Sequence, residues 1–574
     1  MTGSETALAY HEPTITTIIT QAGFLLVLNV VNVCLDRLVY CGLIGQLFIG
    51  MLWGTPGAKW LDRDLETAIQ QLGYLGLIML VYEGGLSTSL PSLKANVLLS
   101  LMVAITGIGV PMGLSFVLGE LVSATPLQAF SAGAALSATS LGTTFAILST
   151  TGLIKTRLGT VTTGAAMLDD VVGLVMVQII TNLGASSGSF SATTVVRPVF
   201  VSIGFAVGVL LGCRFLVTPV LRVIIANKTR LPKPMHTVQF HFLLYTCLLV
   251  VMVAGATYAG TSSLFASYLA GVVTSWIDGF SKDSESVKHT VRQVTHAPMG
   301  EGSGEESNVS EQDQADHAQN PPTSASQDSL SGMVIYERYY RQPVARILTP
   351  LFFASIGFAI PITEMFDGKI IWRGVVYAVL MAFGKLVTGL WLVRFPVTSY
   401  VRILIKPFAQ MAAFCTQPRV KSKNIDQARK KKKETRSQTP QGQSSTHNQT
   451  ETSDIPRFSS QEKLSQTLTQ TSNQIHTTMT HKPKSLYPAS ILGLAMISRG
   501  EIGYLIASLA ESKGIFGASP RGESSEVYLV VVWAISLCTL VGPICVGSLV
   551  RRVKSLQRGR QDVGGEDPLG VWGI

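Results

Sequence analysis

The stretch "GAAMLDDVVGLVMVQII", Gly164–Ile180, places two adjacent carboxylates, Asp169 and Asp170, in a segment that is otherwise largely apolar. On insertion scales, one aspartate at the centre of a membrane helix costs about 2.5–3.5 kcal/mol. An unpaired carboxylate is also costly to bury in a protein interior. We therefore predict that the pair forms a functional site.

The composition is that of a membrane protein. The chain has 574 residues, of which 47% are hydrophobic and 14% charged, with a mean hydropathy of +0.36. Soluble domains contain about 25% charged residues, so we predict an integral, multi-pass protein in a lipid bilayer. The net charge of +10 could suggest nucleic acid as a partner. Most basic residues flank apolar runs, however, where membrane topology explains them, and no nucleic-acid partner is expected.

Cysteine usage and the first residues exclude further classes. The seven cysteines lie in or beside apolar runs and form no CxxC pair, so neither a metal centre nor a disulfide framework is expected. No cofactor is predicted. The opening "MTGSETALAYHEPT" lacks the basic region of a signal peptide. We therefore expect the first apolar run to be retained as a helix.

A membrane helix needs about 20 mostly apolar residues, and the hydropathy pattern predicts about thirteen such helices in an all-α fold. A further stretch, 401–415, is short and carries two basic residues, which is typical of an interfacial helix. The predicted spans are 15–36, 40–56, 69–86, 97–121, 127–150, 158–182, 197–222, 238–258, 261–279, 345–364, 370–394, 486–510 and 525–550.

Basic residues indicate the orientation of these spans. Loops after odd-numbered helices are richer in lysine and arginine than loops after even-numbered ones, which predicts that the former are cytoplasmic. The N-terminus is then outside and the C-terminus inside. Three glycosylation sequons, at Asn227, Asn308 and Asn448, fall on the predicted cytoplasmic side, so none is expected to carry a glycan.

The same pattern divides the chain into six parts. The two long polar stretches contain few aromatics and cannot bury enough apolar surface to fold alone, which predicts disordered loops. The run "RKKKK" in the second loop either fixes topology or attracts anionic lipid. The predicted parts are 1–280 (helices one to nine), 281–343 (disordered cytoplasmic loop), 344–395 (helices ten and eleven), 396–484 (disordered basic cytoplasmic loop), 485–550 (helices twelve and thirteen) and 551–574 (cytoplasmic tail).

Most charged residues of the predicted helices lie near their ends, but the eleventh contains Lys385 in its interior. Neighbouring helical residues point about 100° apart, so Asp169 and Asp170 cannot face the same partner. One can pair with Lys385 while the other faces a cavity. Such charges could serve only as interhelical pairs, but adjacent carboxylates couple their titrations. Beside a lysine that can lose its proton, they favour proton exchange as the function.

Two predicted helices look interrupted. The fifth contains "SAGAALSATSLGTTFAILSTTG" (131–152), and the twelfth contains "SRGEIGY" (498–504) with two glycines around a charge pair. Irregular backbone at membrane depth lines a cavity or is buried in protein; a small-residue packing face is the alternative for the fifth helix. If helices one to six repeat as eight to thirteen, these two helices correspond in inverted repeats. That arrangement indicates a transporter's midplane site.

The motifs "ATSLGTTFAIL" (138–148), "GAAMLDDVVGLV" (164–175), "LTPLFFASIGFAI" (348–360) and "SRGEIGYLI" (498–506) together resemble the monovalent cation:proton antiporter superfamily. The likeness is greatest to its paired-aspartate branch, which includes bacterial and fungal sodium/proton exchangers. It implies a thirteen-helix fold of two inverted repeats with crossed, unwound helices. It also implies a core domain that moves against a dimerisation domain, and hence a homodimer.

The resemblance implies roles for individual residues. Asp170 matches the aspartate that binds the cation and alternately the proton, and Asp169 matches its partner, which can pair with a basic residue at the position of Lys385. Thr139 and Ser140 match the unwound stretch of the first crossing helix. The carried-over site is therefore assembled from three separate helices.

Three more charged residues match positions in the family. Arg499 and Glu501 match the charged motif of the second crossing helix, and Glu83 matches an acidic position near the end of the third helix, where a structural role and a functional role are both open. The paired-aspartate form implies exchange of more protons than cations, which makes transport electrogenic.

We therefore predict a secondary active transporter, and no enzyme, that exchanges Na⁺ or K⁺ for protons by alternating access. Oxygen ligands suit a hard monovalent cation, and competition of that cation with a proton for Asp170 would couple the two fluxes. A cation channel without proton coupling is the alternative. An intramembrane aspartyl protease would need its carboxylates on different helices. The plasma membrane and endomembranes are both candidate locations.

Overall fold

The structure, a computed structural model, describes residues 12–39, 42–88, 90–140, 142–144, 148, 152–154, 156–185, 192–226, 237–295, 331–393, 486–517, 524–561 and 568–573. These residues belong to one of two units of the chain, which comprises 1–393 and 483–574. The other unit, 394–482, contains the predicted interfacial helix and nearly all of the predicted basic loop, which therefore lie outside the described residues.

The described residues are helical apart from their connections. Seven helices are long and apolar enough to cross a membrane, and one more apolar helix, Leu43–Trp53, is shorter. The protein is therefore an integral, multi-pass membrane protein. Helical residues also lie on every other predicted span, in shorter or interrupted segments.

The first part of the chain forms the helices that correspond to predicted spans one to nine. In chain order they are α1 (Ile15–Val39), α2 (Leu43–Trp53), α3 (Arg63–Leu86), α4 (Leu90–Leu114), η1 (Ser115–Val117), α5 (Leu118–Val122), α6 (Pro126–Ser137), α8 (Arg157–Ala185), α9 (Ala192–Gly212), η2 (Cys213–Val217), α10 (Thr218–Ala226), α11 (Val238–Ala259) and α12 (Ser263–Thr295).

The remaining helices correspond to spans ten to thirteen and their flanks. They are α14 (Gly332–Tyr339), α15 (Arg341–Pro343), η5 (Val344–Leu348), α16 (Thr349–Gly357), α17 (Ile362–Met365), α18 (Gly368–Leu386), η6 (Val387–Leu392), α21 (Tyr487–Ala495), α22 (Glu501–Ser512), α23 (Glu526–Gln561) and η7 (Gly570–Trp572).

The edges of the first predicted loop, 281–343, need correction. Helix α12 continues to Thr295, and α14 begins at Gly332. A backbone contact explains the second edge: the Asp278 carboxylate accepts hydrogen bonds from the backbone N–H of Gly332 (2.6 Å) and from the Ser331 hydroxyl (2.8 Å). Polar composition alone had suggested a loop, although lysine, glutamate, arginine and glutamine are also good helix formers. Residues 296–330 lie outside the described part of the chain.

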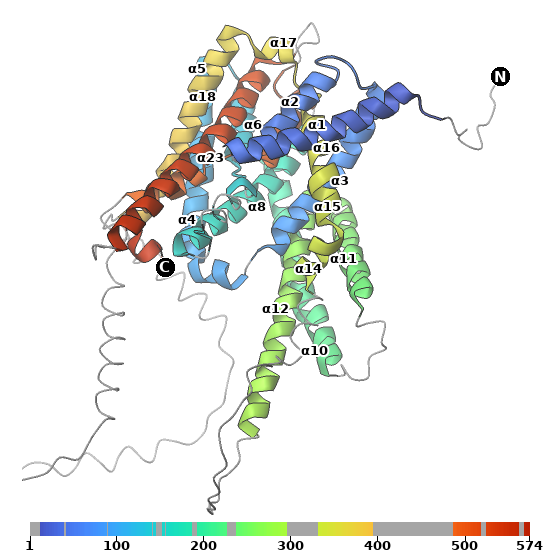
Figure 1. Cartoon of the computed structure of the whole chain (residues 1–574), viewed down its shortest axis with the longest axis vertical. Coiled ribbons are helices and arrows are strands. Elements are labelled where there is room, and N and C mark those ends of the chain that lie inside the picture. The colour runs from blue at the N-terminus through green and yellow to red at the C-terminus, as the bar shows by residue number, and fades with distance from the viewer. Residues whose placement is uncertain are drawn as a thin grey trace, which may run out of the picture. The chain divides into compact units, whose positions relative to one another are not determined.

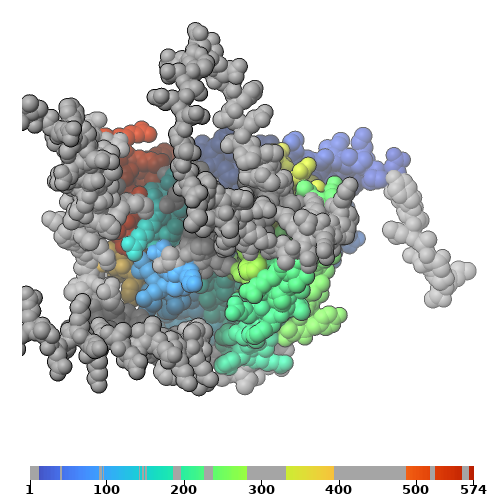
Figure 2. Space-filling model, turned by 90° about the horizontal axis from the view of Figure 1, so that it is seen from below, coloured from blue at the N-terminus to red at the C-terminus, as the bar shows by residue number. Residues whose placement is uncertain are grey.

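The helices pack as two groups (Figure 1). In the scaffold bundle, α3 packs on α12 and α16, α16 on α2, and α11 on α12; in the core bundle, α8 packs on α4 and α22, α18 on α23, and α6 on α4 and α22. The view from below shows the red part of α23 and the green segments of the scaffold bundle on different sides (Figure 2). Helices α8 and α22 of the core bundle contact α12 and α16 of the scaffold bundle, respectively.

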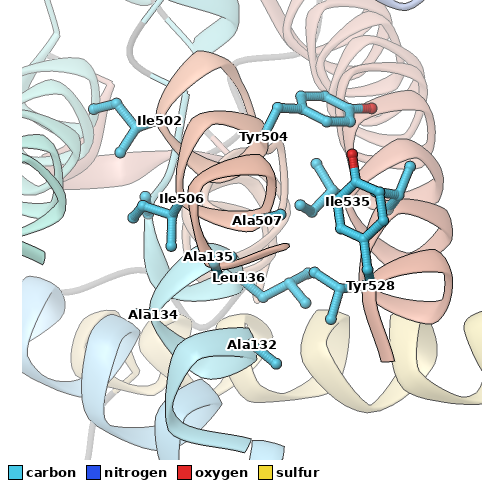
Figure 3. Close-up of a cluster of buried hydrophobic side chains, with 14 of the residues drawn as sticks. Ala132, Ala134, Ala135, Leu136, Ile502, Tyr504, Ile506, Ala507, Tyr528 and Ile535 are labelled. Carbon is cyan, nitrogen blue, oxygen red and sulfur yellow. The ribbon is translucent and has the colours of Figure 1, made fainter. Parts of the chain in front are cut away.

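Small side chains allow the core bundle to pack tightly around α22 (Figure 3). Ala132 and Ala135 of α6 are fully or almost fully buried in the same apolar cluster as Ile506 of α22 and Ile535 of α23. The hydroxyl groups of Tyr504 and Ser536 lie 2.8 Å apart and add a polar contact between α22 and α23. This packing fixes the end of α6 against the start of α22, where the candidate site lies.

Candidate functional site

Two interrupted helices meet at their breaks. Helix α6 ends at Ser137, and Ala138 has extended backbone (φ −63°, ψ 134°). The twelfth predicted span is divided into α21 and α22 by residues 496–500. The backbone N–H of Ser140 donates to the carbonyl oxygen of Ser498 at 3.0 Å. The breaks therefore satisfy part of each other's backbone hydrogen bonding, as irregular backbone at membrane depth requires.

The close approach at this crossing depends on Gly500. A Cβ atom at Gly500 would lie 2.6 Å from the Ser140 hydroxyl oxygen and 2.7 Å from its Cβ. Gly142–Thr144, on the other side of the break in the fifth span, are again helical, and residues 145–147 and 149–151 lie outside the described residues.

The two charged residues of the second break offset the dipole charges at the ends of two different helices. Arg499 is fully buried, and its Nη1 donates to the carbonyl oxygens of Ser137 (3.4 Å) and Ala138 (3.1 Å) at the end of α6. Glu501 is the first residue of α22. A cation at a helix C-terminus and an anion at an N-terminus both complement the helix dipole. Both residues therefore stabilise the crossing.

Lys385, Asp169 and Thr139 form a buried triad. Lys385 Nζ lies 2.6 Å from Asp169 Oδ2 and 2.8 Å from the Thr139 hydroxyl oxygen, and the Thr139 hydroxyl donates to Asp169 Oδ2 at 2.7 Å. Lys385 and Asp169 are 0% exposed. The Thr139 hydroxyl also lies 3.3 Å from the carbonyl oxygen of Met496. The triad thus joins α8 and α18 to both breaks of the crossing.

Sequence reasoning missed a glycine that leaves room for this triad. Gly107 is on α4, and a Cβ atom at this position would lie 3.3 Å from Lys385 Nζ and 3.7 Å from Asp169 Oδ2. Glycine is common in membrane helices, so its presence in the sequence carried no signal for this position.

Asp170 faces the other way, into a cavity of about 490 Å³. It is 7% exposed, and its Oδ1 has no hydrogen-bond partner among the described residues. Ser140 and Glu501 line the same cavity. Glu501 places a second carboxylate in the cavity, and a proton or a cation at Asp170 would offset the negative charge there. This division between neighbours is the one that 100° spacing predicts.

The cavity lies between the two bundles. Helices α1, α2, α12 and α15 contribute polar residues that the sequence analysis did not single out: Asn32, Asp36, Gln46, Tyr268 and Arg341. Asp36, Ser87 and Arg341 lie near helix ends that the predicted topology places on the cytoplasmic side. On the predicted topology, the cavity extends from Asp170 toward the cytoplasmic side.

Glu83 also lines the cavity, but from the scaffold bundle. Its carboxylate accepts a hydrogen bond from the Tyr336 hydroxyl at 3.0 Å. Glu83 thus holds α14 against α3 and lies on the opposite wall from the core-bundle carboxylates. Glu83 shares the cavity but makes its contact within the scaffold side, whereas the structure brings together Asp169, Asp170, Thr139, Ser140, Lys385, Arg499 and Glu501.

Known proteins share both sequence and fold with this chain. Residues 24–297 match the family model "Sodium/hydrogen exchanger, transmembrane". The structure of the sodium proton antiporter MjNhaP1 from Methanocaldococcus jannaschii superposes with a TM-score of 0.53 and 12% identity, covering 94% of this chain and 99% of that one. The chain therefore has the sodium/proton antiporter fold.

Two antiporters resemble the chain in sequence over shorter stretches. The chain is 28% identical over 190 residues (33% of it) to the high-affinity Na⁺/H⁺ antiporter NhaS3 of Synechocystis sp., and 32% identical over 140 residues (24% of it) to the Na⁺/H⁺-K⁺ antiporter GerN of Bacillus cereus. The matches span 41% and 36% of those proteins, less than half of each. The matched exchanger region, the fold and these relatives together support the monovalent cation:proton antiporter superfamily as the family of this chain.

Proposed function

We propose that this protein is a secondary active transporter, and not an enzyme, that exchanges Na⁺ or K⁺ for protons. The observation that carries the proposal is the contrast between Asp169, which pairs with Lys385 in a closed interior, and Asp170, which lines a cavity and makes no ion pair with a described residue. A buried carboxylate without a fixed counter-charge needs a mobile one. A proton and a monovalent cation are the two candidates that fit.

The mechanism is competition at Asp170. A cation in the cavity is bound by the Asp170 carboxylate with further oxygens from the Ser140 hydroxyl and Glu501, which are ligands suited to a hard ion. Protonation of Asp170 removes the main counter-charge, and the cation leaves. Binding of the cation displaces the proton. Only one of the two is carried at a time, which couples their fluxes.

The position of the cavity between the two bundles suggests that the core bundle moves against the scaffold bundle during transport. The carboxylates lie on the core bundle, and the opposite wall belongs to the scaffold bundle. A shift of the core bundle against the scaffold bundle carries the loaded site to the other side of the membrane. An empty, charged Asp170 would have to cross an apolar interface, which is costly. The loaded states are therefore the ones that move.

The Lys385–Asp169 pair sets the charge that moves. If the pair also takes up and releases a proton during the cycle, two protons cross for each cation, and transport is electrogenic. Relatives named as Na⁺/H⁺ and cation/H⁺ antiporters support the substrate class. The proposal includes a homodimer in the bilayer, which is the assembly implied by the family resemblance.

Purified protein in liposomes with a trapped pH dye tests the proposal. Addition of Na⁺ or K⁺ under an imposed pH gradient should change the internal pH for the wild type and not for Asp170→Asn. Asp64→Asn, at the exposed start of α3, is the matched control and should behave as wild type. Cation flux that leaves internal pH unchanged under clamped voltage would indicate a channel and refute the proposal.

A further inference from the structure

The segment Pro568–Gly573 packs onto the core bundle although it belongs to the predicted cytoplasmic tail. Leu569 and Trp572 are 1% and 4% exposed. Both belong to an apolar cluster built by α4, α8, α21 and α23. Members of this cluster from the four helices include Val103, Leu158, Val161, Ile491, Val550 and Val553. The segment is therefore part of the core of the bundle and not of a free tail.

A cation–π contact fixes the tryptophan in place. The Arg157 guanidinium, at the first residue of α8, lies over the Trp572 ring at 5.1 Å from its centroid. Trp572 Nε1 is buried and has no hydrogen-bond partner among the described residues. The indole is thus held by apolar packing and by Arg157, and its N–H adds no bond.

The cluster beneath Trp572 leads toward the buried triad. Arg157 and Asp169 are twelve residues apart on α8, which corresponds to about 18 Å along the helix. At its inner end the cluster includes Met496, whose carbonyl oxygen lies 3.3 Å from the Thr139 hydroxyl. This apolar column therefore runs from Trp572 to the break that the Thr139 hydroxyl contacts. Apolar interiors of this kind stay dry.

We propose that Pro568–Gly573 is a plug that closes this end of the core bundle and keeps water away from the Lys385–Asp169 pair. Its apolar neighbours belong to the core bundle, so the plug moves with that bundle and leaves the Asp170 cavity open. With the plug in place, protons reach the site only through the cavity. The inference rests on the proposed function in taking the triad as part of the proton site.

Proton currents in planar bilayers test the plug, with N-methylglucamine as the only other cation. Under a pH gradient, Leu569→Ala with Trp572→Ala should pass a proton current several-fold above that of the wild type. Trp572→Phe is the matched control, because it keeps an apolar aromatic ring in the cluster, although a smaller one, and should pass a current close to that of the wild type. A current in the double variant equal to that of the wild type would overturn the inference.

A labelling experiment covers the case in which the double variant does not fold. Val161→Cys, in a chain otherwise free of cysteine, places a thiol in the dry column. A water-soluble thiol reagent should leave it unmodified in the presence of Trp572 and modify it in Trp572→Ala. Equal protection in both would overturn the plug. Both measurements need no cation exchange, so failure of the proposed antiport would be seen separately, in the liposome assay.

Discussion

At the scale of single residues, the two adjacent aspartates have different surroundings. Asp169 Oδ2 accepts bonds from Lys385 and Thr139 in a closed interior, whereas Asp170 lines the cavity. The sequence was sufficient to predict that the two face different ways and that Lys385 is the available cation. Which aspartate faces which way depends on the rotation of α8 in the bundle, and that is set by packing against α4 and α22.

Replacing one partner of the buried Lys385–Asp169 pair should lower the stability of the protein far more than replacing both. Lys385→Met leaves Asp169 uncompensated in the interior, and breaking a buried ion pair in this way costs about 3–5 kcal/mol. Adding Asp169→Asn should restore much of the lost stability. Thermal unfolding in detergent of the single and double variants measures the coupling. Simply additive losses would show that the two side chains do not stabilise each other.

Gly107 should be required for transport more than for folding. In Gly107→Ala the new methyl group would lie 3.3 Å from Lys385 Nζ, so the triad must shift by a few tenths of an ångström. We expect slower exchange with nearly unchanged thermal stability. Gly109→Ala, on the same helix with nothing within 4 Å, should exchange at the wild-type rate. Equal rates for both variants in liposomes would contradict this role of Gly107.

At the scale of elements, the crossing of α6 with the α21–α22 break organises the site. Glycine, serine and threonine in the two spans predicted both interruptions, because such residues do not sustain an apolar helix on their own. The sequence could not show that Arg499 caps α6, since that contact joins residues far apart in the chain. For the same reason it gave no sign of the packing of Trp572 on Arg157.

The tight contact between Gly500 and Ser140 in the crossing predicts a destabilised variant. Gly500→Ala would place a methyl group 2.6 Å from the Ser140 hydroxyl oxygen, and overpacking of this kind costs about 1–3 kcal/mol. A lower unfolding temperature and loss of exchange should follow together. Gly255→Ala, on α11 with nothing within 4 Å, is the control and should keep both properties. An unfolding temperature unchanged in Gly500→Ala would rule out the tight crossing.

At the scale of the whole molecule, the cavity between the bundles determines access to Asp170. Its lining includes Ser87, at an end of α3 that the predicted topology assigns to the cytoplasmic side. The two groups of helices could not be assigned from the sequence in detail, because which apolar faces meet depends on long-range packing. The polar extension of α12 to Thr295 was missed for a related reason, since polar composition fits both a loop and an exposed helix.

Thiol labelling from each side of the membrane tests this access. In a cysteine-free background, Ser87→Cys should react with an impermeant reagent added on the cytoplasmic side. Thr125→Cys, at the exposed start of α6, should react only from the opposite side. Reaction of Ser87→Cys from outside alone would reverse the predicted orientation.

Competition of a cation with a proton for Asp170 is tested most directly by proton release from purified protein. Saturating Na⁺ or K⁺ is added to the protein in weakly buffered detergent solution with a pH indicator. Cation binding should release protons from the wild type and none from Asp170→Asn. Linkage also predicts that apparent cation affinity falls by up to about tenfold per pH unit on acidification. Cation binding without proton release, or equal release from Asp170→Asn, would contradict the competition.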